Sequence, residues 1–134
     1  MKKSIIPLLL CSVLAQLPTS VFAESPAAGS STAICFRNSQ NIYPGTAEAG
    51  EYKVIHGPFN TRCGTTAHSF QLRHQVGSRL PVTVEQLVGG TWSKVIRNEY
   101  DPSRRLGNGT FRMILDNTAS THATPYRGSF SVPL

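Results

Sequence analysis

The chain has 134 residues, with 13 basic and 7 acidic side chains and a formal net charge of +6. This length predicts one domain and excludes a multidomain architecture. The modest positive charge favours anionic partners such as acidic glycans, lipid head groups or nucleic acid, but it is also ordinary for a small domain that must stay in solution.

The first 23 residues have the features of a secretory signal peptide. Lys2 and Lys3 form a positive n-region, an apolar run covers residues 5–17, and the V-F-A sequence at 21–23 predicts cleavage after Ala23. The apolar run is too short for a permanent membrane anchor, which needs about 20 residues. We therefore expect an exported protein, periplasmic or extracellular, with no membrane span.

Cys35 and Cys63 are the only cysteines left after this cleavage. Two cysteines in an exported protein most often form one disulfide. In a chain-entropy treatment, a loop of this length contributes roughly 3–4 kcal/mol of stability. A catalytic thiol is the alternative, but neither cysteine lies in a C-x-x-C sequence or another nucleophile-like context.

Residues 24–56 are predicted to contain a leader and two strands joined by a loop. Residues 24–32 are small and polar and contain proline and glycine, which predicts a disordered leader. Residues 33–37 and 52–56 are predicted strands. Residues 38–50 lie between them and are rich in Asn, Gly, Pro and Ala, which predicts a loop.

The stretch 69–96 carries the clearest strand patterns and the only tryptophan, Trp92. Residues 69–76 alternate between apolar and polar, as in a half-buried strand. Segments 82–88 and 91–97 predict a hairpin around Gly89-Gly90. A two-residue loop pairs Leu87 with Trp92 and Val84 with Val95. A three-residue loop gives a better apolar face with Val84 opposite Ile96, but it requires a left-handed Thr91, so we favour the two-residue loop.

The C-terminal part contains two more alternating segments, 110–116 and 126–134, separated by polar loops at 98–109 and 117–125. With no helical spacing anywhere, six or seven short strands predict an all-β fold. We expect a small antiparallel β-sandwich with one disulfide, covering residues 33–134.

The four histidines do not show the spacing of a metal site, and no catalytic nucleophile sequence or phosphate loop is present. His74 lies on the apolar face of its strand and is expected to be a hydrogen-bonded histidine at the margin of the core. We therefore expect no metal, no cofactor and no catalytic residue, although a triad assembled in space remains an alternative.

Arginine is the most suggestive residue type. Three arginines face outward on predicted strands and three lie in predicted loops: Arg73, Arg112 and Arg127, and Arg79, Arg104 and Arg105. If the three strands share one sheet, Arg73, Arg112 and Arg127 form a cationic stripe that binds anions, with Arg104 and Arg105 as further contacts. The competing interpretation is that these arginines only protect solvated faces from edge-to-edge aggregation.

Three functions are compatible with these features. The first is an exported, non-enzymatic binding or structural module that recognises an anionic glycan, a lipid head group or a protein partner. The second is a small exported hydrolase or toxin that uses His and Arg on an anionic substrate, and the third is an inhibitor or immunity-type protein that docks by a loop. Nucleic acid is disfavoured because the aromatic residues face inward. The terminal S-F-S-V-P-L sequence also suggests strand addition to a partner's sheet, which Pro133 opposes.

Overall fold

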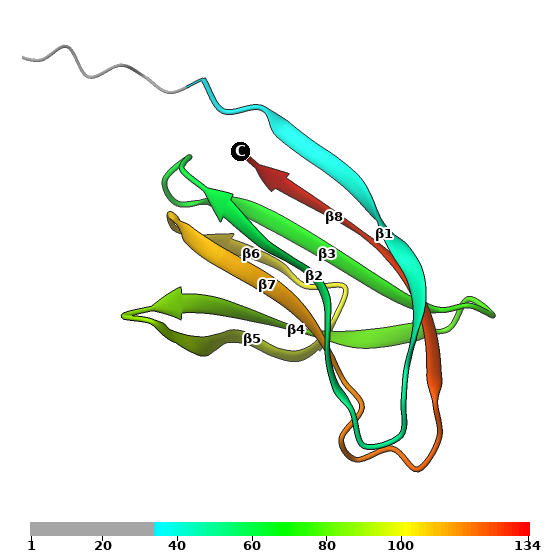
Figure 1. Ribbon diagram of the computed structural model, residues 1–134. Coiled ribbons are helices and arrows are strands. Elements are labelled where there is room, and N and C mark those ends of the chain that lie inside the picture. Colours follow the sequence, from blue (N-terminus) through cyan, green and yellow to red (C-terminus); the bar gives the residue numbers. More distant parts are fainter. Residues whose placement is uncertain (1–33) are drawn as a thin grey trace, which may run out of the picture. The chain divides into compact units, whose positions relative to one another are not determined.

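The computed structural model describes residues 34–134, which form eight strands and no helix (Figure 1). The strands are β1 (Arg37–Ala47), β2 (Tyr52–Thr61), β3 (Thr66–His74), β4 (Arg79–Val88), β5 (Thr91–Tyr100), β6 (Ser103–Leu106), β7 (Gly109–Asp116) and β8 (Thr124–Pro133). The predicted signal peptide and the leader at 24–32 lie outside the described residues. Within the described range, nothing resembles a membrane-crossing helix.

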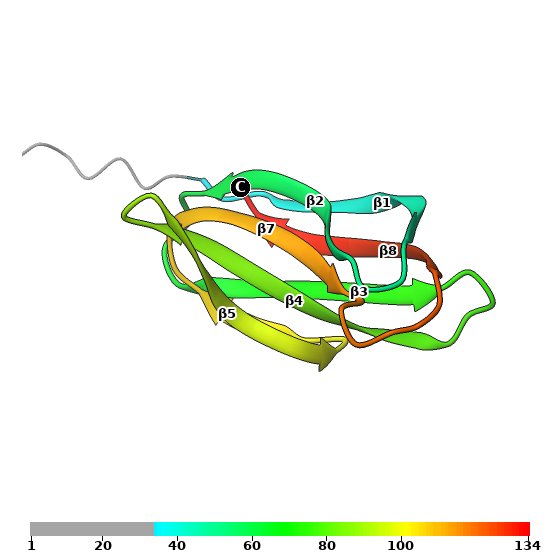
Figure 2. The same cartoon turned by 60° about the horizontal axis from the view of Figure 1, so that its bottom comes forward.

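All strand pairs are antiparallel, and they form two four-stranded halves. Sheet A has the order β1-β8-β3-β6, and sheet B has the order β2-β7-β4-β5; Figure 1 labels all eight strands, and Figure 2 shows the same strands from another side. The halves join where β3 pairs with β4 over two residue pairs. The structure therefore confirms an all-β antiparallel fold. It differs from a simple sandwich because the sheet is continuous and nearly barrel-like.

The core forms from the inward faces of both halves, because successive side chains of a strand point to opposite sides. The predicted inward residues Phe70 and Leu72 of β3 are fully buried, as is Met113 of β7. Val76, predicted on the same face as Phe70, is instead 84% exposed, because β3 ends at His74 and Val76 lies in the turn that follows. The alternation therefore predicted the buried face but not the end of the strand.

Two predicted loops turned out to be strands, which raises the count to eight. Residues 38–50 were predicted as a loop but form most of β1, and the predicted loop 98–109 contains the end of β5 and all of β6. Pro44 misled the prediction. It lies within a break in register between Ile42 and Gly45 of β1, which is an edge strand, and edge strands tolerate proline at such irregularities.

The turn between β4 and β5 matches the favoured prediction. Val88 lies opposite Thr91 and Leu87 opposite Trp92, which leaves Gly89-Gly90 as a two-residue loop. Both glycines have positive φ angles, 57° and 82°, which glycine adopts at little cost.

Further along this hairpin, the predicted pairing of Val84 with Val95 is wrong. Val84 lies opposite Ile96, because the register shifts between Val84 and Glu85. A β-bulge of this kind inserts one extra residue into one strand. The bulge lets the hairpin keep its short turn while Val84 and Ile96 both enter the core.

The predicted disulfide between Cys35 and Cys63 is confirmed, with 5.7 Å between the two Cα atoms. Cys35 precedes β1 and Cys63 follows β2, so the bond joins an edge of sheet A to an edge of sheet B. Both edges of the C-terminal strand are occupied. β8 pairs with β1 on one side and with β3 on the other, so it is not available for the strand addition that the sequence suggested.

Candidate functional site

The structure places three of the five arginines predicted to bind anions on one face of sheet A, two of them adjacent. Arg73 of β3 and Arg127 of β8 are directly opposite each other in sheet A. Arg105 of β6 lies on the same outer side, because it is in register with Ala67, six residues before Arg73 on β3. Arg112 lies in sheet B, and Arg104 alternates with Arg105 and therefore points to the other side of β6. The stripe predicted from Arg73, Arg112 and Arg127 is thus not formed by these three residues.

The outer side of sheet A, which we call the polar face, consists of four rows that cross the strands. Register places these rows side by side along β1, β8, β3 and β6. In order along the strands they are an arginine end (Arg37 and Arg105), a serine row (Ser39, Ser131, Ser69 and Ser103), an amide row (Asn41, Ser129 and Gln71) and a second arginine end (Arg127, Arg73 and, on β4, Arg79).

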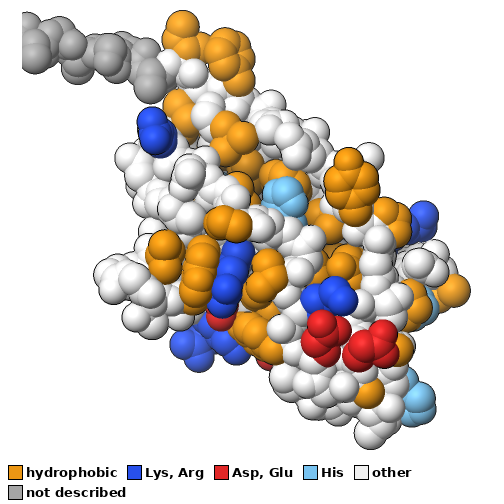
Figure 3. Space-filling model, viewed as in Figure 1, with side chains coloured by type: hydrophobic (Ala, Val, Ile, Leu, Met, Phe, Trp, Pro, Cys, Tyr) orange, Lys and Arg blue, Asp and Glu red, His pale blue; other side chains and the backbone are white. Residues whose placement is uncertain are grey.

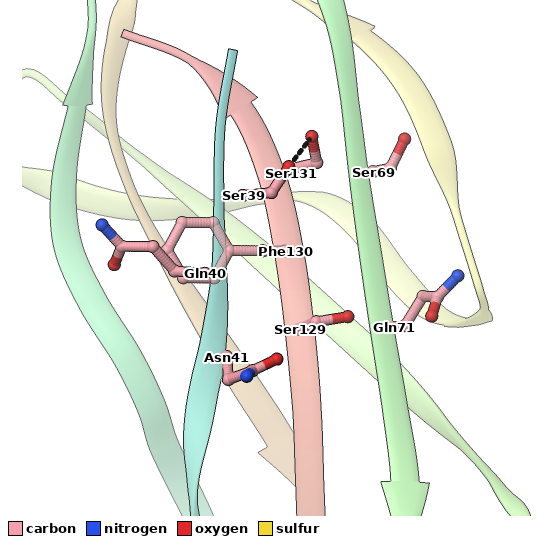
Figure 4. Close-up of a pocket in the computed structure, with 8 residues that line it drawn as sticks. All are labelled: Ser39, Gln40, Asn41, Ser69, Gln71, Ser129, Phe130 and Ser131. Carbon is pink, nitrogen blue, oxygen red and sulfur yellow. Dashed lines mark hydrogen bonds between the residues drawn. The ribbon is translucent and has the colours of Figure 1, made fainter.

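Most of the serine row is satisfied within the protein. Ser39 donates to Ser131 at 2.8 Å between the two Oγ atoms (Figure 4). Arg37 donates to the same Ser131 Oγ at 3.1 Å, and Ser69 and Ser103 are 3.3 Å apart. The serines therefore hold neighbouring strands and one arginine in position.

The amide row is different, because its side chains are not used inside the protein. Within residues 34–134, the side chains of Asn41, Ser129 and Gln71 accept or donate no hydrogen bond, and Figure 4 shows them on three neighbouring strands without a dashed contact. Two shallow hollows meet at this row. One of about 240 Å³ extends over the serines and the other, of about 490 Å³, over Arg73 and Arg127. Asn41, Ser129 and Gln71 line both hollows.

One carboxylate approaches the second arginine end. Asp101, between β5 and β6, accepts two hydrogen bonds from the Arg73 guanidinium and lies 3.3 Å from Arg79 Nε. The hydrogen bonds from Arg73, together with both positive charges, hold the pKa of Asp101 below its usual value. Asp101 therefore neutralises part of this end at neutral pH and fixes the orientation of Arg73.

The remaining arginines of the polar face carry uncompensated charge. Arg37 donates to the Ala67 carbonyl and Arg105 to the Thr65 carbonyl, both neutral acceptors. No ion pair among residues 34–134 involves Arg37, Arg105 or Arg127. The polar face therefore combines five arginines with a single carboxylate, and it is electropositive at both ends.

The outer face of sheet B, by contrast, is a network of paired charges and aromatic rings. Arg112 Nε donates to Glu85 at 2.7 Å, and its guanidinium lies 4.2 Å from the Trp92 ring centre. Tyr52 donates to the other oxygen of Glu85 at 2.7 Å. Lys94 lies over the Tyr52 ring at 4.8 Å. Figure 3 shows a basic side chain between hydrophobic ones on this part of the surface, with an acidic side chain beside it.

The same network explains the position of the tryptophan. Trp92 is half-buried under Arg112 on the outer face and is not part of the core cluster. Tryptophan is usually well buried, but this one is covered from the solvent side by a guanidinium. Stacking with a guanidinium also shields the ring, and it does so at the surface.

The histidines are not gathered in either hollow. The His56 ring packs against Phe130 in a tilted arrangement with 4.2 Å between ring centres, and His68 is completely buried near Phe111. Burial lowers the pKa of both imidazoles. His74 is partly buried and accepts a hydrogen bond from the Val76 amide, in the position expected of it. No set of three metal-binding side chains occurs in the described part of the chain.

Sequence reasoning missed several members of the polar face. Ser39 and Asn41 fell in the predicted loop 38–50, and Arg37 was the last residue of the predicted strand 33–37, whereas all three lie on β1. Arg79 was placed in a loop, although it begins β4 opposite Arg73. The sequence R-N-S-Q-N at 37–41 is polar at every position, so no alternation marked Arg37, Ser39 and Asn41 as one face of a strand.

No protein-family model matches the chain, and the searches of curated proteins and of solved structures found no significant match.

Proposed function

We propose that this protein is an exported, non-enzymatic binding module that recognises an anionic partner through the polar face. The observation that carries the proposal is the pairing of charges. Arginines line both ends of the polar face with one carboxylate among them, whereas the two basic side chains of the sheet B network each face a carboxylate. An arginine without an ionic partner is free to bind a carboxylate, sulfate or phosphate in a bidentate manner.

The alternatives draw less support from the same geometry. A hydrolase or toxin would need histidine and arginine to meet at an accessible site, but His56 and His68 contact core aromatics. An inhibitor could dock by the 98–109 loop or the 117–125 loop. The first loses most of its length, since residues up to 100 belong to β5 and 103–106 form β6, whereas most of the second remains a loop between β7 and β8 but carries no arginine. If the protein has a purely structural role, the arginines of the polar face should contribute nothing to binding. A binding experiment with arginine variants distinguishes this role from anion recognition.

The experiment is retention of the purified protein on an immobilised sulfated polysaccharide at fixed low ionic strength. Arg127→Ala and Arg105→Ala should each weaken binding about tenfold or more, because a hydrogen bond to a charged group contributes about 1.5–3 kcal/mol. The matched control is Arg97→Ala, which removes the same charge from an exposed position of β5 in sheet B. Equal losses in all three variants would show a response to net charge alone and would overturn the assignment to the polar face.

A further inference from the structure

The two arginine ends of the polar face are far apart along the strands. Arg105 is in register with Ala67, and Arg127 with Arg73, so the ends are separated by six residues of β3. At about 3.3 Å per residue this separation is roughly 20 Å. A single compact anion cannot reach both ends, so a ligand that uses the whole face must be extended along the strands.

Between these ends the polar face is uncharged but not inert. Asn41 and Gln71 each carry an amide, which both donates and accepts hydrogen bonds, and Ser129 adds a hydroxyl with the same ability. These groups make no hydrogen bond within residues 34–134 and line both hollows. Their complement is a ligand with hydroxyl groups, since a phosphate or sulfate oxygen only accepts.

The pattern of charge also separates the classes of polymer. Double-stranded DNA has one negative charge per about 1.7 Å of its axis, so it would place phosphates over the uncharged amide row as well as over the arginines. A lipid head group presents a compact charge that one arginine end would satisfy. An acidic polysaccharide presents hydroxyl groups between its acid groups. This order matches the polar face, where the hydroxyl and amide groups lie between two arginine ends.

We propose that the polar face binds a linear acidic polysaccharide that runs parallel to the strands of sheet A. Its carboxylate or sulfate groups contact Arg37 and Arg105 at one end and Arg127 at the other. Its sugar hydroxyls bind Asn41, Ser129 and Gln71 between them. This inference rests on the proposed function, because it names the class of anion that the same face recognises.

The test compares three probes by titration calorimetry on the full chain: a linear polyuronate, a sulfated linear polysaccharide, and inorganic polyphosphate, which has charge but no sugar hydroxyls. The amide-row variant is Gln71→Leu with Ser129→Ala, two substitutions on a solvent-facing surface. We expect it to bind one or both polysaccharides about tenfold more weakly, since each neutral hydrogen bond contributes about 0.5–1.5 kcal/mol. Its affinity for polyphosphate should stay unchanged, and its unfolding midpoint should match that of the parent.

A second arm tests the length of the ligand. Fragments of the polyuronate too short to span about 20 Å should bind more weakly than longer ones, and Arg37→Ala should reduce affinity only for the longer fragments.

If polyphosphate binds as tightly as the polysaccharides and the amide-row variant changes neither, the polysaccharide inference fails while anion binding by the polar face survives. If Arg127→Ala also changes nothing, the proposed function fails with it. Tight binding to anionic vesicles that Arg37→Ala leaves intact would favour a lipid head group and overturn the inference.

Discussion

The outer faces of sheet A and sheet B both carry basic residues, but they use them in opposite ways. In sheet B, Arg112 and Lys94 face Glu85 and Asp116, and both cations also lie over aromatic rings. In sheet A, Asp101 is the one carboxylate among five arginines of the polar face. The comparison teaches that the number of arginines in a sequence does not locate a binding face, because partners elsewhere in the fold decide which charges are available.

The two faces also differ in what their hydrogen bonds are used for. Glu85 is buried and accepts hydrogen bonds from both Tyr52 and Arg112, so the sheet B network connects β2, β4 and β7. The amide row of sheet A makes no such internal connections. We therefore expect substitutions in the sheet B network to change stability, and substitutions on the polar face to change binding.

The largest effect should come from the covalent link between the two sheets. The disulfide joins the start of β1, next to Arg37 of the polar face, to the end of β2, an edge strand of sheet B. Its sequence separation is 28 residues, and reduction should lower the free energy of unfolding by roughly 3–4 kcal/mol. Denaturant unfolding with and without reductant measures this loss. An unchanged midpoint, or two thiols that titrate in the native protein, would contradict it.

The next effect compares one carboxylate from each face. Glu85→Ala leaves the partly buried Arg112 without its partner and should cost about 2–4 kcal/mol of stability. Asp101→Asn keeps a side chain that tolerates the positive φ of 48° at this position, and it removes a pair with the largely exposed Arg79, so it should cost less than Glu85→Ala, about 1 kcal/mol. Urea unfolding of both variants gives the two differences. Equal costs would mean that the two faces do not divide stability and binding between them.

Much of the fold could be predicted from the sequence, because the interior imposes a regular pattern. Alternation in 69–76 predicted that Phe70 and Leu72 are buried, and the cysteine count predicted the disulfide. The failures lie at edges. β1 has a solvent-facing edge and includes Pro44 at a bulge, so its sequence resembles a loop. A strand with one neighbour is constrained by fewer contacts, and its pattern is correspondingly weak.

The candidate site was harder to predict than the fold, because it depends on register between distant strands. Arg73 and Arg127 were recognised as outward-facing, but nothing in the sequence indicated that they are opposite each other. Arg112 looked equivalent to them, and only the structure shows that Glu85 neutralises it. Glu85 and Arg112 are 27 residues apart in the sequence, and the alternation within each strand does not indicate which residues of distant strands become neighbours.

A smaller effect should come from the interior between the two faces, where burial lowers the pKa of His56 and His68. The unfolded state then binds protons more readily than the folded state. Stability is fully present above the unfolded value of about 6.5 and falls as pH decreases below it, by about 1.4 kcal/mol for each unit of pKa difference. Unfolding free energies measured from pH 7 to 5 should show this slope, and His56→Gln should reduce it.

The smallest effect is the most direct comparison of the two faces, because it makes the same substitution on each. Asp101→Asn removes the carboxylate beside Arg73 and Arg79, and it should raise the affinity of the polar face for a sulfated polysaccharide. A charge at about 4 Å in water contributes about 1 kcal/mol, so the gain at low ionic strength should be about fivefold and should shrink as salt is added. Asp116→Asn changes the net charge equally but acts beside Lys94 of sheet B. It should leave the affinity unchanged, and an equal gain in both variants would mean that net charge, rather than the unpaired arginines of one face, attracts the anion.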